Sequence, residues 1–432
     1  MKTLYEHADI LALNGDKFEV IKNGYLGIDD SFIDYVGEAT PAAEYEEKRN
    51  FSGKLLMPGL INAHTHSSMT LLRGLGSDLP LQSWLFDYMF PTEDRLRPRD
   101  IKAGTELALL EMLSTGTTSF TDMYFFPATA IEACLSAGMR ANICRPVQCF
   151  NPDEKPEENV RMRESFELYR NFHHAGEDLI RVDFCIHGEY TCTEPVVRAY
   201  SEKCAELEGR MHIHMSETKS EHQGCIEKYG CTPAEWFAKN HTFDTPTSAA
   251  HCVWVTPEDM AIMREYGVTA VHNPASNLKL GSGIAPVESM RAAGINVALG
   301  TDGAASNNNL NMFEELKLAS LIHNGAMLDP TVMKPDYTLR MATAGGAAAQ
   351  GRNDTGALAP GYRADIVAVD MTRPNLYPAP NIPAALCYSA QGADVYMTMV
   401  NGRVLYENGE FLTIDAERVM YDAAESVKYL GI

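Results

Sequence analysis

The stretch GRMHIHMSE, residues 209–217, contains the unit that decides the fold: a Gly, a short apolar strand, and polar residues where the strand ends. Similar units recur along the middle of the chain: TTSFTDMY after Gly116, MRANICRPV after Gly138, EDLIRVDFCIHGEY after Gly176, VTAVHNPAS after Gly267 and INVALGTDG after Gly294. Gly accepts the left-handed conformation that ends a helix. The pattern therefore predicts a repeated alternation of helix and strand.

Two further strands, 55–64 and 248–255, complete a set of eight. The segments between the strands read as amphipathic helices, for example 99–114, 194–207 and 257–266. Strands that are apolar throughout suit a parallel sheet covered on both faces. Eight such units favour an α/β fold of the (β/α)8 TIM-barrel type over residues 58–356. A doubly wound open sheet is the alternative, because periodicity alone does not prove closure.

The two ends of the chain have a different pattern, in which short strands alternate with turns. Before Met57 the predicted strands lie in DILALNG, FEVIKNGYLGI and SFIDYVG, and in the tail they lie in ADIVAVD and DVYMTMVNGRVLYENGEFL. Neither end is large enough to fold alone, so we expect residues 1–57 and 357–432 to pair into one small, sandwich-like β domain. Residues 74–97 read as a long loop, with a helical turn or two around Trp84, placed to cover a barrel mouth.

Composition and charge limit the class of function. Of the 432 residues, 45% are hydrophobic and 22% are charged, the profile of a soluble globular protein. The 36 basic and 58 acidic residues give a net charge of −22, so we expect neither nucleic acid nor an anionic membrane as a partner. The ten cysteines form no Cys-x-x-Cys pair, and the N-terminus has no signal-peptide run. We expect a reduced, cytoplasmic enzyme, and a homo-oligomer is left open.

Ionisable side chains gather at the C-terminal ends of the predicted strands. Six of the 13 histidines lie there, together with four other charged residues; the set is His64, His66, Asp122, Arg145, His187, His214, Glu217, His251, His272 and Asp302. Active sites of α/β barrels are built at that end of the strands. This placement is the strongest functional signal in the sequence.

A metal site is the first expectation from this set. His64 and His66 leave one strand on the same face, His214 adds a third nitrogen, and Asp302 in LGTDG adds a carboxylate. Three imidazoles and a carboxylate suit one divalent ion, Zn²⁺ or Fe²⁺, and these ligands alone do not choose between the two. The FCIHGEY strand offers no Lys, so a two-metal site bridged by a modified lysine is not expected.

The other residues of the set have competing interpretations. Glu217, three residues after His214, is placed to carry a proton for water at the metal, although a helix N-terminus also favours Glu. His251 is a candidate for orienting or deprotonating that water, and His187 is a candidate substrate contact. We expect His272 to be structural, and Asp122 suits a loop cap as well as a catalytic role.

The motifs of the middle of the chain resemble the amidohydrolase superfamily, and more narrowly the deaminases of 5′-methylthioadenosine and S-adenosylhomocysteine. The similarity is carried by PGLINAHTHSSM, HIHMSET, AHCVWV, VHNPASNLKLGSG and LGTDGAASNNNLNMFEELK, within residues 55–361. The resemblance implies hydrolytic deamination of an adenosine-type nucleoside to the inosine analogue and ammonia, with one divalent metal ion held by His64, His66, His214 and Asp302.

The resemblance also implies roles for the remaining site residues. Glu217 would protonate the ring nitrogen next to the attacked carbon, and His251 with Asp302 would steer and deprotonate the water. Glu93 in FPTEDRL stands where the family holds the ribose hydroxyls. His187 matches a second substrate contact, and Arg145 a third near the 5′ substituent.

Two alternatives stay open at this point. Guanine deaminases and triazine hydrolases have closely related frameworks, so another amino- or chloro-substituted heterocycle is the alternative substrate. A metal-binding barrel that has lost catalysis is the alternative from a different class, although such a scaffold has no need of a proton carrier such as Glu217. Ammonia release from a panel of nucleosides and bases discriminates among all three.

Overall fold

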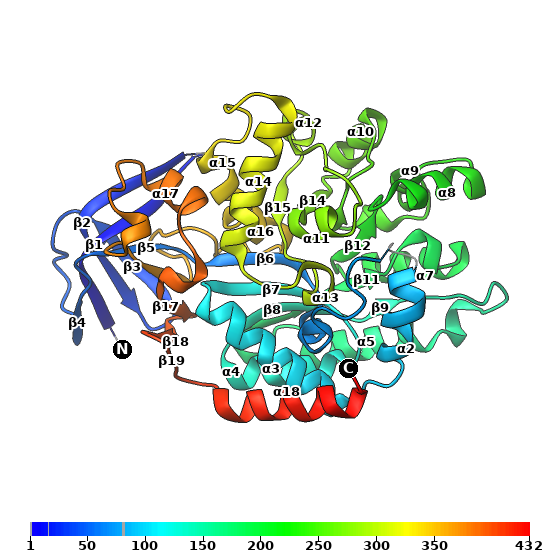
Figure 1. The fold of residues 1–432 in the computed structure, drawn as a ribbon, viewed down its shortest axis with the longest axis horizontal. Coiled ribbons are helices and arrows are strands. Elements are labelled where there is room, and N and C mark those ends of the chain that lie inside the picture. The colour runs from blue at the N-terminus through cyan, green and yellow to red at the C-terminus, as the bar shows by residue number, and fades with distance from the viewer. Residues whose placement is uncertain (1, 16, 80–82) are drawn as a thin grey trace.

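The two ends of the chain meet in one mixed sheet. The computed structural model describes residues 2–15, 17–79 and 83–432. The strand order is β19-β18-β17-β16-β5-β1-β2-β3, with β4 beside β1, at the left of Figure 1. The antiparallel pair β5 and β16, with Leu56 opposite Ala368, joins the two ends. The bounds are β1 (Lys2–Asn14), β2 (Lys17–Asp29), β3 (Phe32–Gly37), β4 (Glu47–Asn50), β5 (Lys54–Pro58), β16 (Ile366–Asp370), β17 (Val395–Val400), β18 (Arg403–Glu407) and β19 (Glu410–Phe411).

The middle of the chain forms two parallel sheets, which confirms the predicted α/β class. One has the order β10-β8-β7-β6 and the other β15-β14-β13-β12-β11-β9. Arg145 alone separates β8 from β9, and Asp183 alone separates β10 from β11, so two strand paths pass from one sheet into the other. The bounds are β6 (Leu60–Thr65), β7 (Thr117–Met123), β8 (Arg140–Cys144), β9 (Pro146–Val147), β10 (Ile180–Val182), β11 (Phe184–Ile186), β12 (Met211–Met215), β13 (Thr247–His251), β14 (Thr269–His272) and β15 (Val297–Leu299).

The first strand of the predicted set is divided. Sequence pattern predicts one strand over 55–64, but the structure breaks it at Gly59 and places β5 in the mixed sheet and β6 in a parallel sheet. A Cβ at Gly59 would lie 2.0 Å from Thr118 Oγ1, so only Gly allows the chain to pass β7 this closely. A continuous apolar run therefore conceals a change of sheet.

Helices connect the parallel strands as the sequence predicts, and α10 shows why. Thr256 accepts the N–H of Asp259, whose carboxylate accepts the N–H of Thr256, and Pro257 occupies the first turn. The three helices predicted in detail are found within one residue of the expected bounds. The main helices between β6 and β17 are α3 (Pro98–Ser114), α4 (Pro127–Ala137), α5 (Val160–Phe172), α7 (Glu194–Glu206), α8 (Lys219–Tyr229), α9 (Pro233–Lys239), α10 (Pro257–Glu265), α11 (Pro274–Lys279), α12 (Val287–Ala292), α14 (Met312–Met327), α15 (Pro335–Met341), α16 (Ala344–Ala349) and α17 (Ile382–Tyr388).

The prediction that a left-handed Gly ends each helix is confirmed at four of the six positions. Positive φ angles follow the helices at Gly116, Gly138, Gly267 and Gly294. After α7, however, Glu208 takes the left-handed conformation with a φ of 51° instead of Gly209. A Cβ at Gly209 would lie 2.5 Å from the Phe184 ring, so close packing against β11 explains that Gly. Gly176 lies inside the short α6 (Ala175–Asp178) instead of ending α5.

The segment before α3 and the last helix pack together on one side of the molecule. The predicted loop 74–97 contains a π-helical turn, η2 (Trp84–Met89), and α2 (Phe90–Glu93), while its residues 80–82 lie outside the described residues. The last helix, α18 (Ala416–Leu430), runs along α3 at the bottom of Figure 1, and Arg418 donates to Glu106. Leu430 joins Trp84 and Met89 in one apolar cluster.

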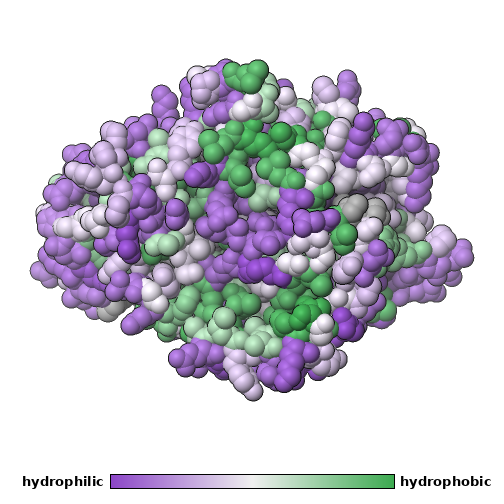
Figure 2. Space-filling view, in the orientation of Figure 1, coloured by the Kyte–Doolittle hydropathy of each residue, from purple (hydrophilic) through white to green (hydrophobic). Residues whose placement is uncertain are grey.

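The surface is mixed in character. Figure 2 shows hydrophilic residues over much of this face, with hydrophobic areas between them. Exposed Leu321 and Met327 belong to α14, and such apolar side chains are ordinary on a globular surface. None of the helices in the described residues combines the length and apolar character needed to cross a bilayer. All ten cysteines are buried and free.

A buried ion pair ties the mixed sheet to the parallel sheets. Arg140, at the start of β8, donates from Nε to Asp365 Oδ2 at 2.6 Å and from Nη2 to Oδ1 at 3.1 Å. The side chains of Arg140 and Asp365 are 0% and 3% exposed. Asp365 also accepts the N–H of Asn401 at 2.7 Å, so it anchors the turn after β17 as well.

We expect Asp365→Asn to lower the free energy of unfolding by about 3–5 kcal/mol, because it leaves the Arg140 charge buried without its partner. Denaturant titration followed by circular dichroism measures this change. Lys203→Met is the matched control: its partner Glu206 is exposed, and loss of such a surface pair changes the free energy by at most about 1 kcal/mol. Equal stability of both variants would contradict a tethering role for this pair.

Candidate active site

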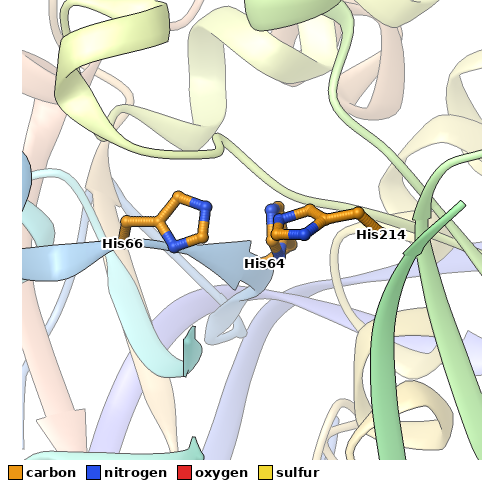
Figure 3. A group of neighbouring side chains, drawn as sticks. All are labelled: His64, His66 and His214. Atoms are coloured by element: carbon orange, nitrogen blue, oxygen red, sulfur yellow. The ribbon is translucent and has the colours of Figure 1, made fainter. Parts of the chain in front are cut away.

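Side chains from the ends of β6, β12 and β13 and from the segment after β15 converge in the structure. His64 and His66 come from the end of β6, and His214 comes from β12; Figure 3 shows their rings turned toward one another. One ligand atom from each of these three residues lies within 4.8 Å of the others, and the same holds for His64, His251 and Asp302. The four residues predicted to bind metal are therefore brought together, with His251 beside them.

Backbone carbonyls fix the tautomers of two of the imidazoles. His66 donates from Nδ1 to the carbonyl of Met123 at 2.5 Å, and His214 donates from Nδ1 to the carbonyl of His187 at 2.6 Å. A neutral ring that carries its proton on Nδ1 presents a bare Nε2. Both rings are thus oriented as metal ligands are, with the second nitrogen held by a neighbouring acceptor.

His64 is held by a chain of polar contacts. Its Nδ1 lies 2.8 Å from Nε2 of His212, whose Nδ1 lies 2.7 Å from the hydroxyl of Ser248. The Nε2 of His64 is buried and has no hydrogen-bond partner in the described part of the chain. Burial lowers the pKa of His64 to about 4, so the ring is neutral near pH 7.

Asp302 supplies the negative charge of the cluster. Its Oδ1 lies 3.4 Å from His64 Nε2 and 3.3 Å from His66 Nε2. Its Oδ2 accepts hydrogen bonds from the hydroxyls of Ser276 and Ser306. Burial alone would raise the pKa of Asp302, but His64 and His66 outweigh it and hold the pKa well below its usual range.

A divalent ion fits these donors. His66 Nε2 carries no proton in the neutral ring, and it faces an ionised carboxylate oxygen at 3.3 Å. Two acceptors this close, both with lone pairs directed inward, repel each other unless a cation lies among them. Neutral imidazoles and one carboxylate are ligands of zinc and of other first-row divalent ions.

Glu217 and His251 face each other next to this cluster. His251 Nε2 lies 3.8 Å from Glu217 Oε2, while His251 Nδ1 lies 2.9 Å from the amide oxygen of Asn277. Burial raises the pKa of the Glu217 carboxyl group, so this group retains a proton more readily than an exposed glutamate does. Burial lowers the pKa of His251, but Glu217 and Asp302 outweigh it, and the net pKa is raised. Both groups can hold or move a proton.

The strand ends that carry these residues have strained backbones. The φ angles are 50° at Ser216, 76° at His251, 50° at Cys252 and 62° at Asp302, although none of these residues is Gly. Left-handed conformations of such residues each cost on the order of 1–3 kcal/mol and cluster at functional sites. These left-handed conformations turn the chain sharply at the ends of β12 and β13 and in the segment after β15.

A pocket opens from the cluster toward the segment before α3. Its apolar wall includes Met69, Trp84, Leu85, Phe90, Tyr124, Phe125 and Leu280, and its polar residues include His66, Glu93, His187, His214, Glu217, His251 and Asp302. Glu93 accepts the hydroxyl of Tyr124 at 2.7 Å. Burial raises the pKa of Glu93, although the bond from Tyr124 opposes this shift. The neutral side chain of His187, with a pKa lowered to about 3 by burial and the nearby His66 and His64, is also in the pocket.

Three predicted strand-end residues lie apart from this pocket. Arg145 is not among its lining residues; the guanidinium donates to Glu164 at 2.8 Å and lies over the Phe125 ring. His272 Nε2 lies 3.2 Å from His323 Nε2, and both rings are buried, an arrangement typical of structural histidines. Asp122 accepts the N–H and the hydroxyl of Ser67, so it caps the turn after β6.

Sequence reasoning missed the residues that hold the site residues in place. Tyr124, Ser276, Asn277 and Ser306 bond to Glu93, Asp302 and His251. Tyr124 follows Asp122 by two positions at a strand end, which is a signal that could have identified it. Ser276 and Asn277 belong to the motif VHNPASNLKLGSG, but they lie on a helix, α11, whose orientation depends on the fold.

Comparisons with known proteins identify the family of the chain. A model of the amidohydrolase family matches residues 55–405. The chain is 43% identical to a 5-methylthioadenosine/S-adenosylhomocysteine deaminase of Acetivibrio thermocellus over 99% of both chains. It is 38% identical to a 5′-deoxyadenosine deaminase of Methanosarcina acetivorans over 99% of this chain and 98% of the other. A crystal structure of an adenosine deaminase from Xanthomonas campestris with bound zinc superposes with a TM-score of 0.93 at 29% identity, covering 99% and 98% of the two chains.

We expect the purified protein to bind about one divalent transition-metal ion per chain. His66→Ala and His214→Ala should each lower metal content after dialysis by more than about tenfold, because each removes a nitrogen ligand. Plasma mass spectrometry measures the metal. His241→Ala, at an exposed histidine paired with Asp244, is the control and should keep wild-type content. Full metal content in His214→Ala would exclude this ligand set.

Proposed function

The chain belongs to the amidohydrolase family, and we propose that it is a metal-dependent deaminase of adenosine-type nucleosides. The reaction forms a C6–O bond with water and breaks the C6–N bond of the purine, releasing ammonia and the inosine analogue. The substrates we propose are 5′-methylthioadenosine, S-adenosylhomocysteine and adenosine. The names of the relatives with 43% and 38% identity support this substrate class.

One observation carries the proposal. A single pocket holds a cluster of metal-ligand type, the proton carrier Glu217 beside it, and a second carboxylate, Glu93, on the segment before α3. Glu93 keeps one oxygen in a bond to Tyr124, and an ionised carboxylate has further lone pairs that can accept ribose hydroxyls. The aromatic and aliphatic wall suits a purine and an apolar 5′ substituent.

The metal is proposed to be zinc, held by His64, His66, His214 and Asp302. When bound, such an ion supplies the Lewis acidity that makes water a nucleophile near neutral pH. His64 and His214 can serve as ligands because their rings are neutral, whereas a protonated imidazole cannot bind a cation. Asp302, held by the hydroxyls of Ser276 and Ser306, keeps one oxygen directed into the cluster.

Glu217 moves the proton on the purine side. Its raised pKa retains a proton in the buried site, and transfer of that proton to N1 lets the ring accept electron density as C6 is attacked. His251, oriented by Asn277, faces both Glu217 and Asp302 and, together with Asp302, steers the water and accepts its proton. His187, a neutral donor or acceptor in the pocket wall, contacts the substrate. Arg145 stays a predicted contact for the 5′ substituent.

We also infer that the two parallel sheets form one closed (β/α)8 barrel over residues 58–356, with a composite β domain made of 1–57 and 357–432. The shared strand paths at Arg145 and Asp183 support continuity at one seam. At the other seam, Asp302 donates its N–H to the carbonyl of His64 at 3.0 Å, so the chain after β15 lies beside β6.

A substrate panel tests the function. We expect ammonia release from methylthioadenosine, adenosylhomocysteine and adenosine, and little from guanine or amino-triazines, which have no ribose hydroxyls for Glu93. A coupled ammonia assay on the metal-loaded enzyme gives kcat/KM for each compound. Preference for guanine or a triazine would favour the alternative heterocycle class, and absence of release from every compound would favour a scaffold.

Glu217→Gln tests the proton carrier. We expect kcat to fall by about 10²–10⁴-fold, because an amide cannot deliver a proton to N1. Metal content and thermal stability should match the wild type, since Glu217 is not one of the proposed ligands. Near-normal turnover in this variant would show that another group carries the proton.

A further inference from the structure

The side chain of Glu221, in the first turn of α8, accepts hydrogen bonds from the turn that carries Glu217. Glu221 Oε1 accepts the N–H of Ser216 at 2.8 Å. Its Oε2 accepts the N–H of Glu217 at 2.7 Å and that of Thr218 at 3.3 Å. Three successive backbone donors therefore point at one carboxylate.

This arrangement exceeds ordinary helix capping. In a capping box the third residue of the helix accepts the N–H of the N-cap residue alone, here Thr218. The bonds to Ser216 and Glu217 lie outside the helix and fix the chain before it begins. Ser216 has a left-handed φ of 50°, so the carboxylate stabilises a conformation that a non-Gly residue adopts only at a cost.

A second carboxyl group, that of Glu189 after β11, supports Glu221. Glu189 is 1% exposed, and neither of its oxygens accepts a hydrogen bond from another residue in the described chain. It lines a second pocket together with Glu221. Burial and Glu221 raise the pKa of Glu189 well above its usual range, and burial with Glu217 raises the pKa of Glu221 to about 7. Two neighbouring carboxyl groups of this kind are not both ionised, so the pair shares a proton.

We propose that Glu221, with the buried carboxyl group of Glu189 beside it, is the positioning residue for Glu217. Glu221 is neither among the residues that line the pocket opening from the metal-ligand cluster nor among the proposed metal ligands; it acts through the backbone N–H of Glu217. The inference rests on the proposed function, in which Glu217 transfers a proton, and it identifies the side chains that set where that proton is held.

Glu221→Gln tests the contact. Whichever way its amide turns, the NH2 group faces at least one backbone N–H that formerly had an acceptor. We expect kcat to fall by about 10–100-fold, because a shift of about 1 Å in a catalytic group has an effect of this size. KM should stay within about threefold, since the substrate contacts are intact. The control is Glu227→Gln, an exposed position on the same helix, which should keep wild-type kcat.

Hydrogen exchange gives a readout that does not depend on turnover. The amides of Ser216, Glu217 and Thr218 should exchange faster in Glu221→Gln than in wild type, and at wild-type rates in Glu227→Gln. Mass spectrometry of peptides spanning residues 211–221 measures this in the metal-loaded enzyme. Unchanged exchange, or a kcat within about threefold of wild type, overturns the inference. A wild type without deaminase activity would instead defeat the proposed function, while the exchange comparison still tests the contact.

Glu189 variants separate positioning from folding. Gln at position 189 replaces the O–H donor with an N–H donor, so Glu189→Gln should keep kcat within about threefold of wild type, whereas Glu189→Ala should lower kcat by about tenfold or more. If Glu221→Gln does not fold, this pair decides the question. Equal kcat in Glu189→Gln and Glu189→Ala would show that Glu189 has no positioning role.

Discussion

His66 Nε2 and Asp302 Oδ1 lie 3.3 Å apart, and in the neutral tautomer there is no proton between them. This close approach of two acceptors is the constraint on which the site depends. Burial makes the imidazoles of His64 and His214 neutral. The carbonyls of Met123 and His187 hold the Nδ1 protons of His66 and His214 on the far side of the rings. The protein thereby prepares a site of concentrated negative potential that is compensated only by a cation.

The surrounding structure holds these groups against their mutual repulsion. The hydroxyls of Ser276 and Ser306 fix Asp302, and Asn277 fixes His251. The left-handed residues at the strand ends place the side chains close together at a backbone cost that packing of the parallel sheets offsets. The residues of the cluster, Glu217 and the pocket wall thus come from several elements that the fold brings together.

Much of this could be predicted from the sequence, because parallel strands bring their C-terminal ends together and the chemically active residues stand at those ends. His64, His66, His214, Glu217, His251 and Asp302 are found together for that reason. Residues that reach the site from a helix or a side turn, such as Asn277 and Glu221, could not be identified, since their contacts depend on how an element is oriented. The break at Gly59 was hidden because apolar residues continue through it. Arg145 lies at a strand end, yet its side chain turns toward Glu164, a choice that strand position does not determine.

The pairing of β5 with β16 has a consequence for the order in which the molecule can form. Strand β5 (Lys54–Pro58) has no hydrogen-bonding partner on that side until β16 (Ile366–Asp370) has been synthesised, more than 300 residues later. The cluster beneath Trp84 and Met89 waits longer still, for Leu430 of α18. A nascent chain emerging from the ribosome exposes an unpaired apolar strand for most of its elongation, a state prone to aggregation. The wall that carries Glu93 is therefore among the last parts of the enzyme to be completed, and incomplete chains lack a finished pocket.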